Sequence, residues 1–151
     1  MARRPDAARL AVWRAFLETH RAVLTRLEDE LQAERGLSLD WYDVLVQLHE
    51  AGGARRMQEL AGALLIDKSS LSRRIDRMCM AGLVERHASP DDRRGTLAVL
   101  TAEGRAALKN AAPVHLRGIH WHFTQHLSDS DVAALRRIFS KVLTGMDGEP
   151  E

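Results

Sequence analysis

The stretch that decides the fold covers residues 67–77 and has the sequence DKSSLSRRIDR. Its first residue, an aspartate, is placed to cap a helix that Gly82 then stops. At 100° per residue, Leu71, Ile75 and Met78 lie on one apolar face of that helix. The opposite face carries hydroxyls and basic side chains. The stretch therefore predicts a half-buried helix with a cationic outer surface.

A short helix is expected before this stretch, and a β-hairpin is expected after it. The hairpin strands are residues 83–88 and 96–100, where the apolar period changes to two, and they flank the turn SPDDRRG at 89–95. Helix, turn, helix and hairpin in this order predict a winged helix-turn-helix, hence a mainly α fold with a small β-hairpin wing. The apolar positions of the preceding helix are Met57, Leu60, Ala61, Leu64 and Leu65.

Longer amphipathic helices are expected on both sides of this unit. Gly36 stops the first of them, and Ser38 is placed to cap the next, which carries Trp41, Leu45 and Leu48 inward. Thr101 is placed to cap a later helix that Pro113 should kink or restart. Ser128 and Asp131 open the last helix. The side chains that this helix is expected to bury are Val132, Leu135, Ile138, Phe139 and Val142.

Residues 1–151 are expected to form a single domain. The apolar stripes of the two ends need partners that one small winged unit does not supply. We therefore expect dimerisation helices at 8–35 and 102–145 and a winged DNA-binding lobe at 38–100. The alternative is that the end helices cover only each other within a monomer.

Composition favours a soluble cytoplasmic protein. The chain has 45% hydrophobic residues and a single cysteine, Cys79, whose thiol pKa an apolar setting should raise. No apolar run is long enough to span a bilayer, so no membrane partner is expected. The net charge is only +1, but residues 55–95 hold nine bases against six acids, whereas residues 18–50 hold eight acids against three bases. A basic middle segment favours DNA as the partner.

The candidate DNA contacts lie on the basic helix and in the hairpin turn. Hydroxyls near a helix N-terminus permit close approach to phosphate, and arginines reach guanine or phosphate oxygens. An arginine at the wing tip suits the narrow minor groove, with Asp92 and Gly95 shaping the turn. These candidates are Lys68, Ser69, Ser70, Arg73, Arg77, Arg93 and Arg94.

In four stretches the chain resembles the MarR family of bacterial regulators. They are GLSLDWYDVL at 36–45, MQELA at 57–61, DKSSLSRRIDR at 67–77 and SPDDRRG at 89–95, the last running on to a Leu-Thr pair. The resemblance covers residues 8–145. It implies a homodimer that binds a pseudo-palindromic double-stranded operator and thereby represses transcription. No phosphate-binding glycine loop or nucleophile elbow supports an enzyme, and no cofactor is expected.

The resemblance extends to the urate-responsive branch of that family. It implies that a small anionic aromatic effector, such as urate or a phenolic acid, releases the DNA. The positions that match the effector site of the branch are Trp13, Asp43, Ser72 and Arg74, although SLSRR at 70–74 departs from the recognition helix usual there. Trp13 is alternatively a core aromatic of the dimer stripe, and Arg74 is alternatively a phosphate contact or an ion-pair partner of Asp43.

Two further interpretations stay open. His115, His122 and His126 share a helical face at intervals of seven and four, which favours zinc binding or a pH response. No carboxylate or cysteine is expected on that face. The other interpretation is a winged-helix adaptor that binds protein. An adaptor would lack the arginines at 73, 77 and 94.

Overall fold

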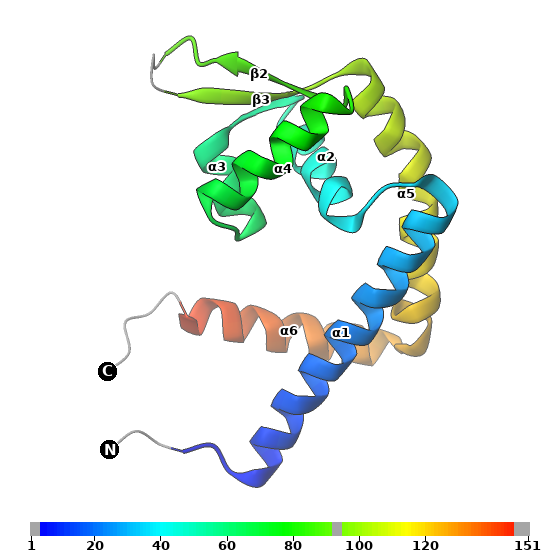
Figure 1. Ribbon diagram of the computed structural model, residues 1–151. Helices are drawn as coiled ribbons and strands as arrows, with labels where there is room; N and C mark the ends of the chain where they lie inside the picture. The colour runs from blue at the N-terminus through cyan, green and yellow to red at the C-terminus, as the bar shows by residue number, and fades with distance from the viewer. Residues whose placement is uncertain (1–3, 92–94, 147–151) are drawn as a thin grey trace.

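The computed structural model describes residues 4–91 and 95–146, so the predictions for Asp92, Arg93 and Arg94 concern residues outside the described ranges. A winged lobe lies at one end of two long helices that run side by side, and the last helix crosses their far end (Figure 1). The elements are α1 (Ala7–Arg35), α2 (Leu39–Glu50), β1 (Ala54–Arg56), α3 (Met57–Leu64), α4 (Lys68–Met80), β2 (Val84–Ala88), β3 (Thr96–Leu100), α5 (Ala102–His122), the 3-10 turn η1 (Thr124–His126) and α6 (Asp129–Met146).

The helix boundaries expected from capping residues are confirmed. The Ser38 hydroxyl accepts a hydrogen bond from the Trp41 N–H at 3.2 Å, and Gly36 ends α1 with φ at 60°. The Thr101 hydroxyl caps α5, and Ser128 and Asp131 satisfy each other's N–H groups at the start of α6. Each cap satisfies a backbone donor that the helix itself leaves free. Pro113 lies inside the continuous helix α5 and does not restart it.

The sheet has three antiparallel strands in the order β1-β3-β2. The hairpin β2–β3 was expected, and the structure places Val84 opposite Leu100. The third strand, β1, was not expected, because its three residues are an alanine and two arginines without apolar alternation. It forms because its backbone pairs with β3, Ala54 opposite Val99, which gives the wing hairpin a fixed base.

The hydrophobic core lies in the winged lobe and extends into the crossing of α1 and α5. Leu71, Ile75 and Met78 of α4 are fully buried, as the helical spacing predicts. Leu65, the last apolar position expected in α3, is 92% exposed and ends that helix with left-handed backbone torsions. The buried side chains with the largest volumes are Leu31, Leu45, Leu48, Leu60, Leu71, Ile75 and Met78.

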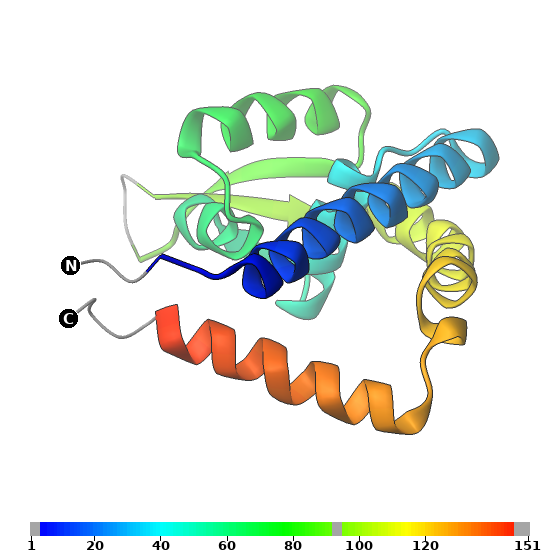
Figure 2. The same cartoon turned by 90° about the horizontal axis from the view of Figure 1, so that it is seen from below.

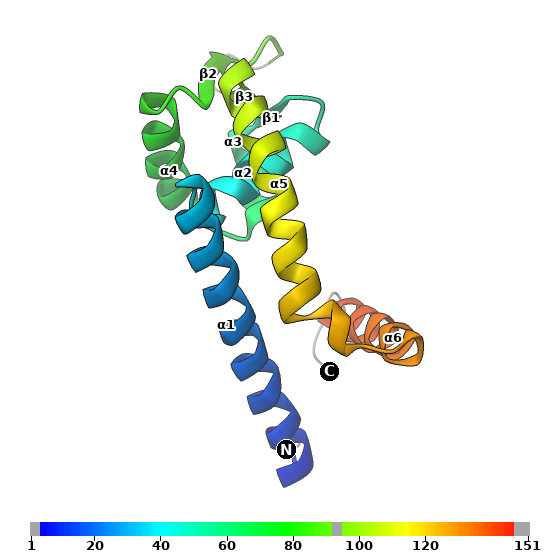
Figure 3. The ribbon, with the colours of Figure 1, turned by 90° about the vertical axis from the view of Figure 1, so that its right-hand side faces the viewer.

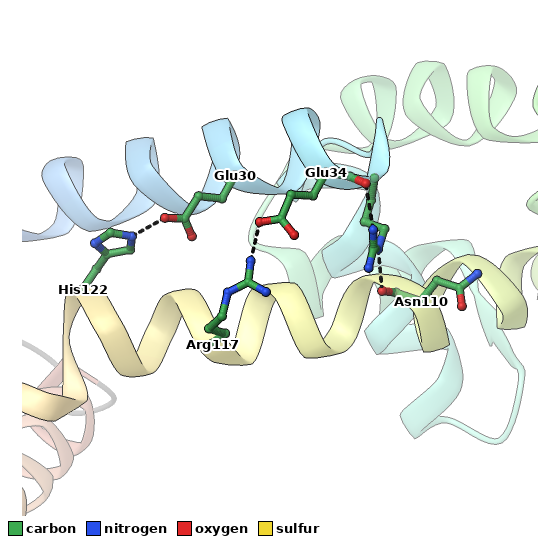
Figure 4. Close-up of polar contacts among 6 residues, drawn as sticks. Glu30, Glu34, Asn110, Arg117 and His122 are labelled. Carbon is green, nitrogen blue, oxygen red and sulfur yellow. Dashed lines mark hydrogen bonds and ion pairs between the residues drawn. The ribbon is translucent and has the colours of Figure 1, made fainter.

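Helix α1 runs beside α5 over its second half (Figure 3). Leu27 packs close to Gly118 of α5, where a Cβ atom would lie 2.6 Å from the leucine Cδ2. Three polar contacts follow along the same seam (Figure 4). They are His122 Nε2 to Glu30 Oε1 at 2.6 Å, the ion pair Arg117–Glu34, and Arg35 Nε donating to the Asn110 carbonyl at 2.9 Å.

The first half of α1 and all of α6 keep large apolar side chains exposed. The prediction that α6 buries its apolar side chains is wrong for the described chain, in which no α6 residue is buried. The two helices touch through Phe16 and Phe139, whose ring centroids lie 6.2 Å apart. Seen from below, α1 and α6 are the helices nearest the viewer (Figure 2). None of the helices within residues 4–91 and 95–146 combines the length and hydropathy needed to cross a membrane.

Candidate DNA-binding surface

Helix α4 is held by a cap at its start and by its buried apolar stripe. Asp67 accepts a hydrogen bond from the Ser70 N–H at 2.8 Å. The fully buried Leu71 and Ile75 press one face of the helix into the lobe, so the opposite face points away from the core. This geometry presents the first turns of α4 on the surface, as a helix that enters a DNA groove requires.

The outward face of α4 is basic. Lys68, Arg73 and Arg77 are exposed, and none of the three forms an ion pair with another residue of the described ranges. Ser69 is exposed and Ser70 is half-buried. The five α4 residues expected to contact DNA therefore lie near the surface, and the three cations are available to an anionic partner.

The two serine hydroxyls are used differently from the expectation. Ser69 and Ser70 each donate to the Asp67 carboxylate at 2.6 Å. These hydrogen bonds hold the pKa of Asp67 well below its ordinary range. Both hydroxyls therefore already have an acceptor within the protein, and their expected contacts with DNA remain predictions.

A polar hollow of about 270 Å³ lies between α4 and the start of α2. Arg74 of α4 reaches across it to Asp40 of α2, with 3.3 Å between nitrogen and oxygen. Arg73 and Arg77 line the same hollow, and Trp41 closes it from α2. Asp40 and Trp41 were not expected at this surface, because the helical spacing of α2 indicated only which residues enter the core.

The four residues expected to bind an effector do not meet in one chain. Asp43 lies near Arg74, although the arginine pairs with Asp40 instead. Burial raises the pKa of Asp43, the charge of Asp40 raises it further, and Arg74 lowers it. Ser72 lies on the other flank of α4, where its hydroxyl accepts from Arg86. Trp13 is exposed on α1 and lies near Phe16 with its ring tilted, the ring centroids being 5.9 Å apart.

The wing hairpin stands beside α4. Arg56 of β1 reaches Asp91 at 3.7 Å, which ties the start of the turn to the sheet. Gly95, just before β3, is half-buried and lines a hollow between the hairpin and α4. The expected roles of Arg93 and Arg94 at the tip, and of Asp92 in shaping it, concern residues outside the described ranges and remain predictions.

A larger cavity, which the sequence did not reveal, lies between α2 and α5. Its volume is about 490 Å³. Tyr42, one of its lining residues, contacts His115, with 4.5 Å between the ring centroids. The His115 Nδ1 atom is buried without a hydrogen-bond partner among the described residues, and burial lowers the pKa of this histidine. The cavity is lined by Tyr42, Val46, His49, Glu50, Arg105, Leu108, Lys109 and Ala112.

The histidine face expected on α5 does not form. His126 lies in η1 beyond the end of the helix, while His115 contacts Tyr42 and His122 pairs with Glu30. Glu30 comes from α1, so a carboxylate does reach one of these histidines, contrary to the expectation. Within residues 4–91 and 95–146 no three histidine, cysteine or acidic side chains are grouped to hold a metal ion. Burial raises the pKa of the Cys79 thiol, as predicted.

The fold is similar to solved structures over nearly its full length. AbsC, a MarR family transcriptional regulator from Streptomyces coelicolor, covers 98% of this chain and 100% of its own length, with a TM-score of 0.89 and 35% identity. The chain belongs to the MarR family. A model of the MarR family also matches residues 35–95, which contain α2, α3, α4 and most of the wing.

Other MarR family relatives agree with this assignment. Sco3205 from Streptomyces coelicolor, solved in complex with DNA, covers 99% of this chain and 94% of its own, with a TM-score of 0.91 and 31% identity. The multiple antibiotic resistance protein MarR of Escherichia coli is 35% identical over 85 residues, 56% of this chain. The match spans 59% of the length of that curated relative. The family consists of transcriptional regulators, which places the chain among regulators and not among enzymes.

Proposed function

We propose that this protein is a homodimeric transcriptional repressor that binds a double-stranded, pseudo-palindromic operator and leaves it when a small anionic aromatic molecule binds. The observation that carries the proposal is the basic outward face of α4, presented beside a wing on a MarR fold. Arg73 and Arg77 are exposed and have no ion-pair partner within the described residues, so they can pair with phosphates or base edges. We take these arginines, which the adaptor interpretation did not expect, to favour DNA as the partner.

Operator binding is tested with a duplex selected by the wild-type protein from a random library. Arg73→Ala and Arg77→Ala should each weaken binding by about 1–3 kcal/mol if the side chain contacts a base. If the lost contact is to phosphate, the slope of log K against log salt should fall by about 0.9. Arg21→Ala, an exposed arginine of α1, is the charge-matched control. Equal affinities for all four proteins at two salt concentrations would contradict the proposal.

The exposed apolar side chains of α1 and α6 support the proposal that the protein is a homodimer. An apolar hollow of about 200 Å³ opens there between Phe16, Leu24 and Phe139. Contiguous exposed apolar surface of this extent marks an interface. The large exposed side chains of this face are Leu10, Trp13, Phe16, Leu17, Leu24, Ile138, Phe139, Val142 and Leu143.

Sedimentation equilibrium tests this interface. Val142→Asp should shift the protein toward monomer, because the carboxylate would be desolvated between two subunits. Leu65→Asp is the matched control, since Leu65 is 92% exposed in the winged lobe and far from α6. A dimer of unchanged dissociation constant in Val142→Asp would exclude this face as the interface.

The effector is best accommodated by the cavity between α2 and α5. Its walls are apolar at Val46, Leu108 and Ala112, whereas Arg105 and Lys109 supply positive charge. Apolar walls with a few convergent polar groups favour a flat aromatic anion. The set Trp13, Asp43, Ser72 and Arg74 remains the competing site. In one chain only Asp43 and Arg74 of that set are neighbours.

Titration of urate and of small phenolic acids into the protein and operator complex separates these sites. If the cavity is the site, Lys109→Met should weaken the response to the active compound, whereas Arg74→Met should leave it in place. The reverse result would favour the competing set. If zinc or a change of pH alone releases the DNA and none of these compounds does, the proposal of a small anionic aromatic effector is wrong.

A further inference from the structure

The wing strand β2 has little apolar anchorage beside α4. It is an edge strand, and only its first residue, Val84, is buried, while the other four residues are exposed. Backbone pairing of β3 with β1 and β2, together with the buried Val84, fixes the base of the hairpin. The outer part of β2 has no such anchorage, so side-chain contacts decide how it lies against α4.

Arg86 makes that contact. A single guanidinium nitrogen of this residue lies 3.0 Å from the Ser72 carbonyl, 3.0 Å from the Ser72 hydroxyl and 2.8 Å from an Asp76 carboxylate oxygen. All three acceptors belong to α4, so one side chain of the wing binds two successive turns of the helix. We refer to Arg86, Ser72 and Asp76 as the Arg86 brace.

The brace also accounts for an acidic residue on a basic helix. Asp76 follows Arg73 along the same exposed face, where a free carboxylate would repel DNA phosphates. Its pairing with Arg86 neutralises that charge and uses it to hold the wing. An isolated surface ion pair contributes little, but this arginine side chain is only 31% exposed and also binds the Ser72 backbone.

We propose that Arg86 is a positioning residue that fixes the spacing between α4 and the wing, so that the two elements meet DNA as one rigid unit. The proposal rests on the proposed operator binding for its functional consequence. Its structural part concerns the free protein. Arg86 itself need not touch DNA, because its donors are directed at Ser72 and Asp76.

The free protein provides the first test. Spin labels at Ala88 of β2 and at the exposed Met80 of α4, in a Cys79→Ala background, report the distance between the wing and the helix. Arg86→Met should broaden this distance distribution, and Arg86→Lys should broaden it less, because lysine keeps the charge but not the geometry of the guanidinium. Glu85→Gln, on the same strand and outside the brace, should leave the distribution unchanged.

Operator binding provides the second test. Arg86→Met should weaken binding about fivefold or more. In the complex of Arg86→Met with the operator, the DNA backbone next to the wing should lose its protection from hydroxyl radicals. The major-groove guanines next to α4 should remain protected. A change in a structural residue alone would weaken both protections equally.

An unchanged distance distribution in Arg86→Met, at unchanged circular dichroism, would overturn the proposal. Equal loss of both protections would also overturn it. If the wild-type protein binds no duplex, the proposed function fails, and the spin-label distances still decide whether Arg86 sets the position of the wing.

Discussion

Replacing Gly104 with alanine should destabilise the protein, although alanine is the better helix former. Gly104 is buried in the first turn of α5, where its N–H donates to the Thr101 hydroxyl at 3.0 Å. A Cβ atom there would overlap the backbone carbonyl oxygen of Leu83 and lie 2.8 Å from the Leu100 Cδ1. The leucine side chain can rotate away. The carbonyl cannot, because it also accepts a hydrogen bond from the Thr101 N–H.

The magnitude follows from two opposing effects. Overpacking at a fixed neighbour costs about 1–3 kcal/mol, and a backbone obstacle places this site in the upper part of that range. Replacing glycine with alanine inside a helix stabilises the helix by about 1 kcal/mol. We therefore expect the free energy of unfolding to fall by about 1–2 kcal/mol.

Urea denaturation followed by circular dichroism measures this change. Gly62→Ala is the matched control, because it is also a helix position and its Cβ would meet no described atom within 4 Å. The control should stabilise the protein by up to about 1 kcal/mol, so the two variants should move in opposite directions. A Gly104→Ala protein as stable as the wild type would refute the argument that Leu83 blocks this position.

Three further changes test other features of the chain. Leu65→Gly should stabilise the protein by about 0.5–1 kcal/mol in thermal or urea unfolding, because it removes left-handed strain from a leucine that is 92% exposed. Burial lowers the pKa of His115, so stability should fall as pH drops below the ordinary histidine pKa near 6.5, and His115→Phe should flatten that slope between pH 7 and 5. The raised pKa of Asp43 means that its charge opposes folding at neutral pH; Asp43→Asn should raise Tm at pH 7, and this gain should shrink as the wild-type carboxyl becomes protonated in acid.

The local features of α4 and its neighbours were predictable because they depend on residues close together in the chain. Asp67 caps the helix and Ile75 is buried, since capping and helical spacing act within a few residues. The exposure of Leu65 could not be read from apolar spacing, because it depends on the left-handed backbone conformation of this residue at the end of α3. β1 was missed for a similar reason, because its partner strand lies more than forty residues away.

The candidate site was predictable only where it consists of one element. Arg73 and Arg77 lie on the surface as their helical positions indicate. Arg74 and Ser72 share the same helix but turn to opposite flanks, toward Asp40 and toward Arg86. Neither partner follows from the spacing along α4, because each comes from another element. The same holds for the cavity between α2 and α5.

The polar seam between α1 and α5 limits how the length of this chain can change during evolution. One residue inserted between Glu30 and Arg35 would rotate one part of α1 by about 100° relative to the other, separating Arg35 from Asn110 or Glu30 from His122. A seven-residue insertion would leave the angle within about 20°, but it would lengthen α1 by about 10 Å and would preserve both contacts only with an equal insertion in α5. An insertion before Leu27 disturbs none of these contacts. Deletions and insertions among homologues of this chain should therefore cluster before Leu27, or occur in α1 and α5 together.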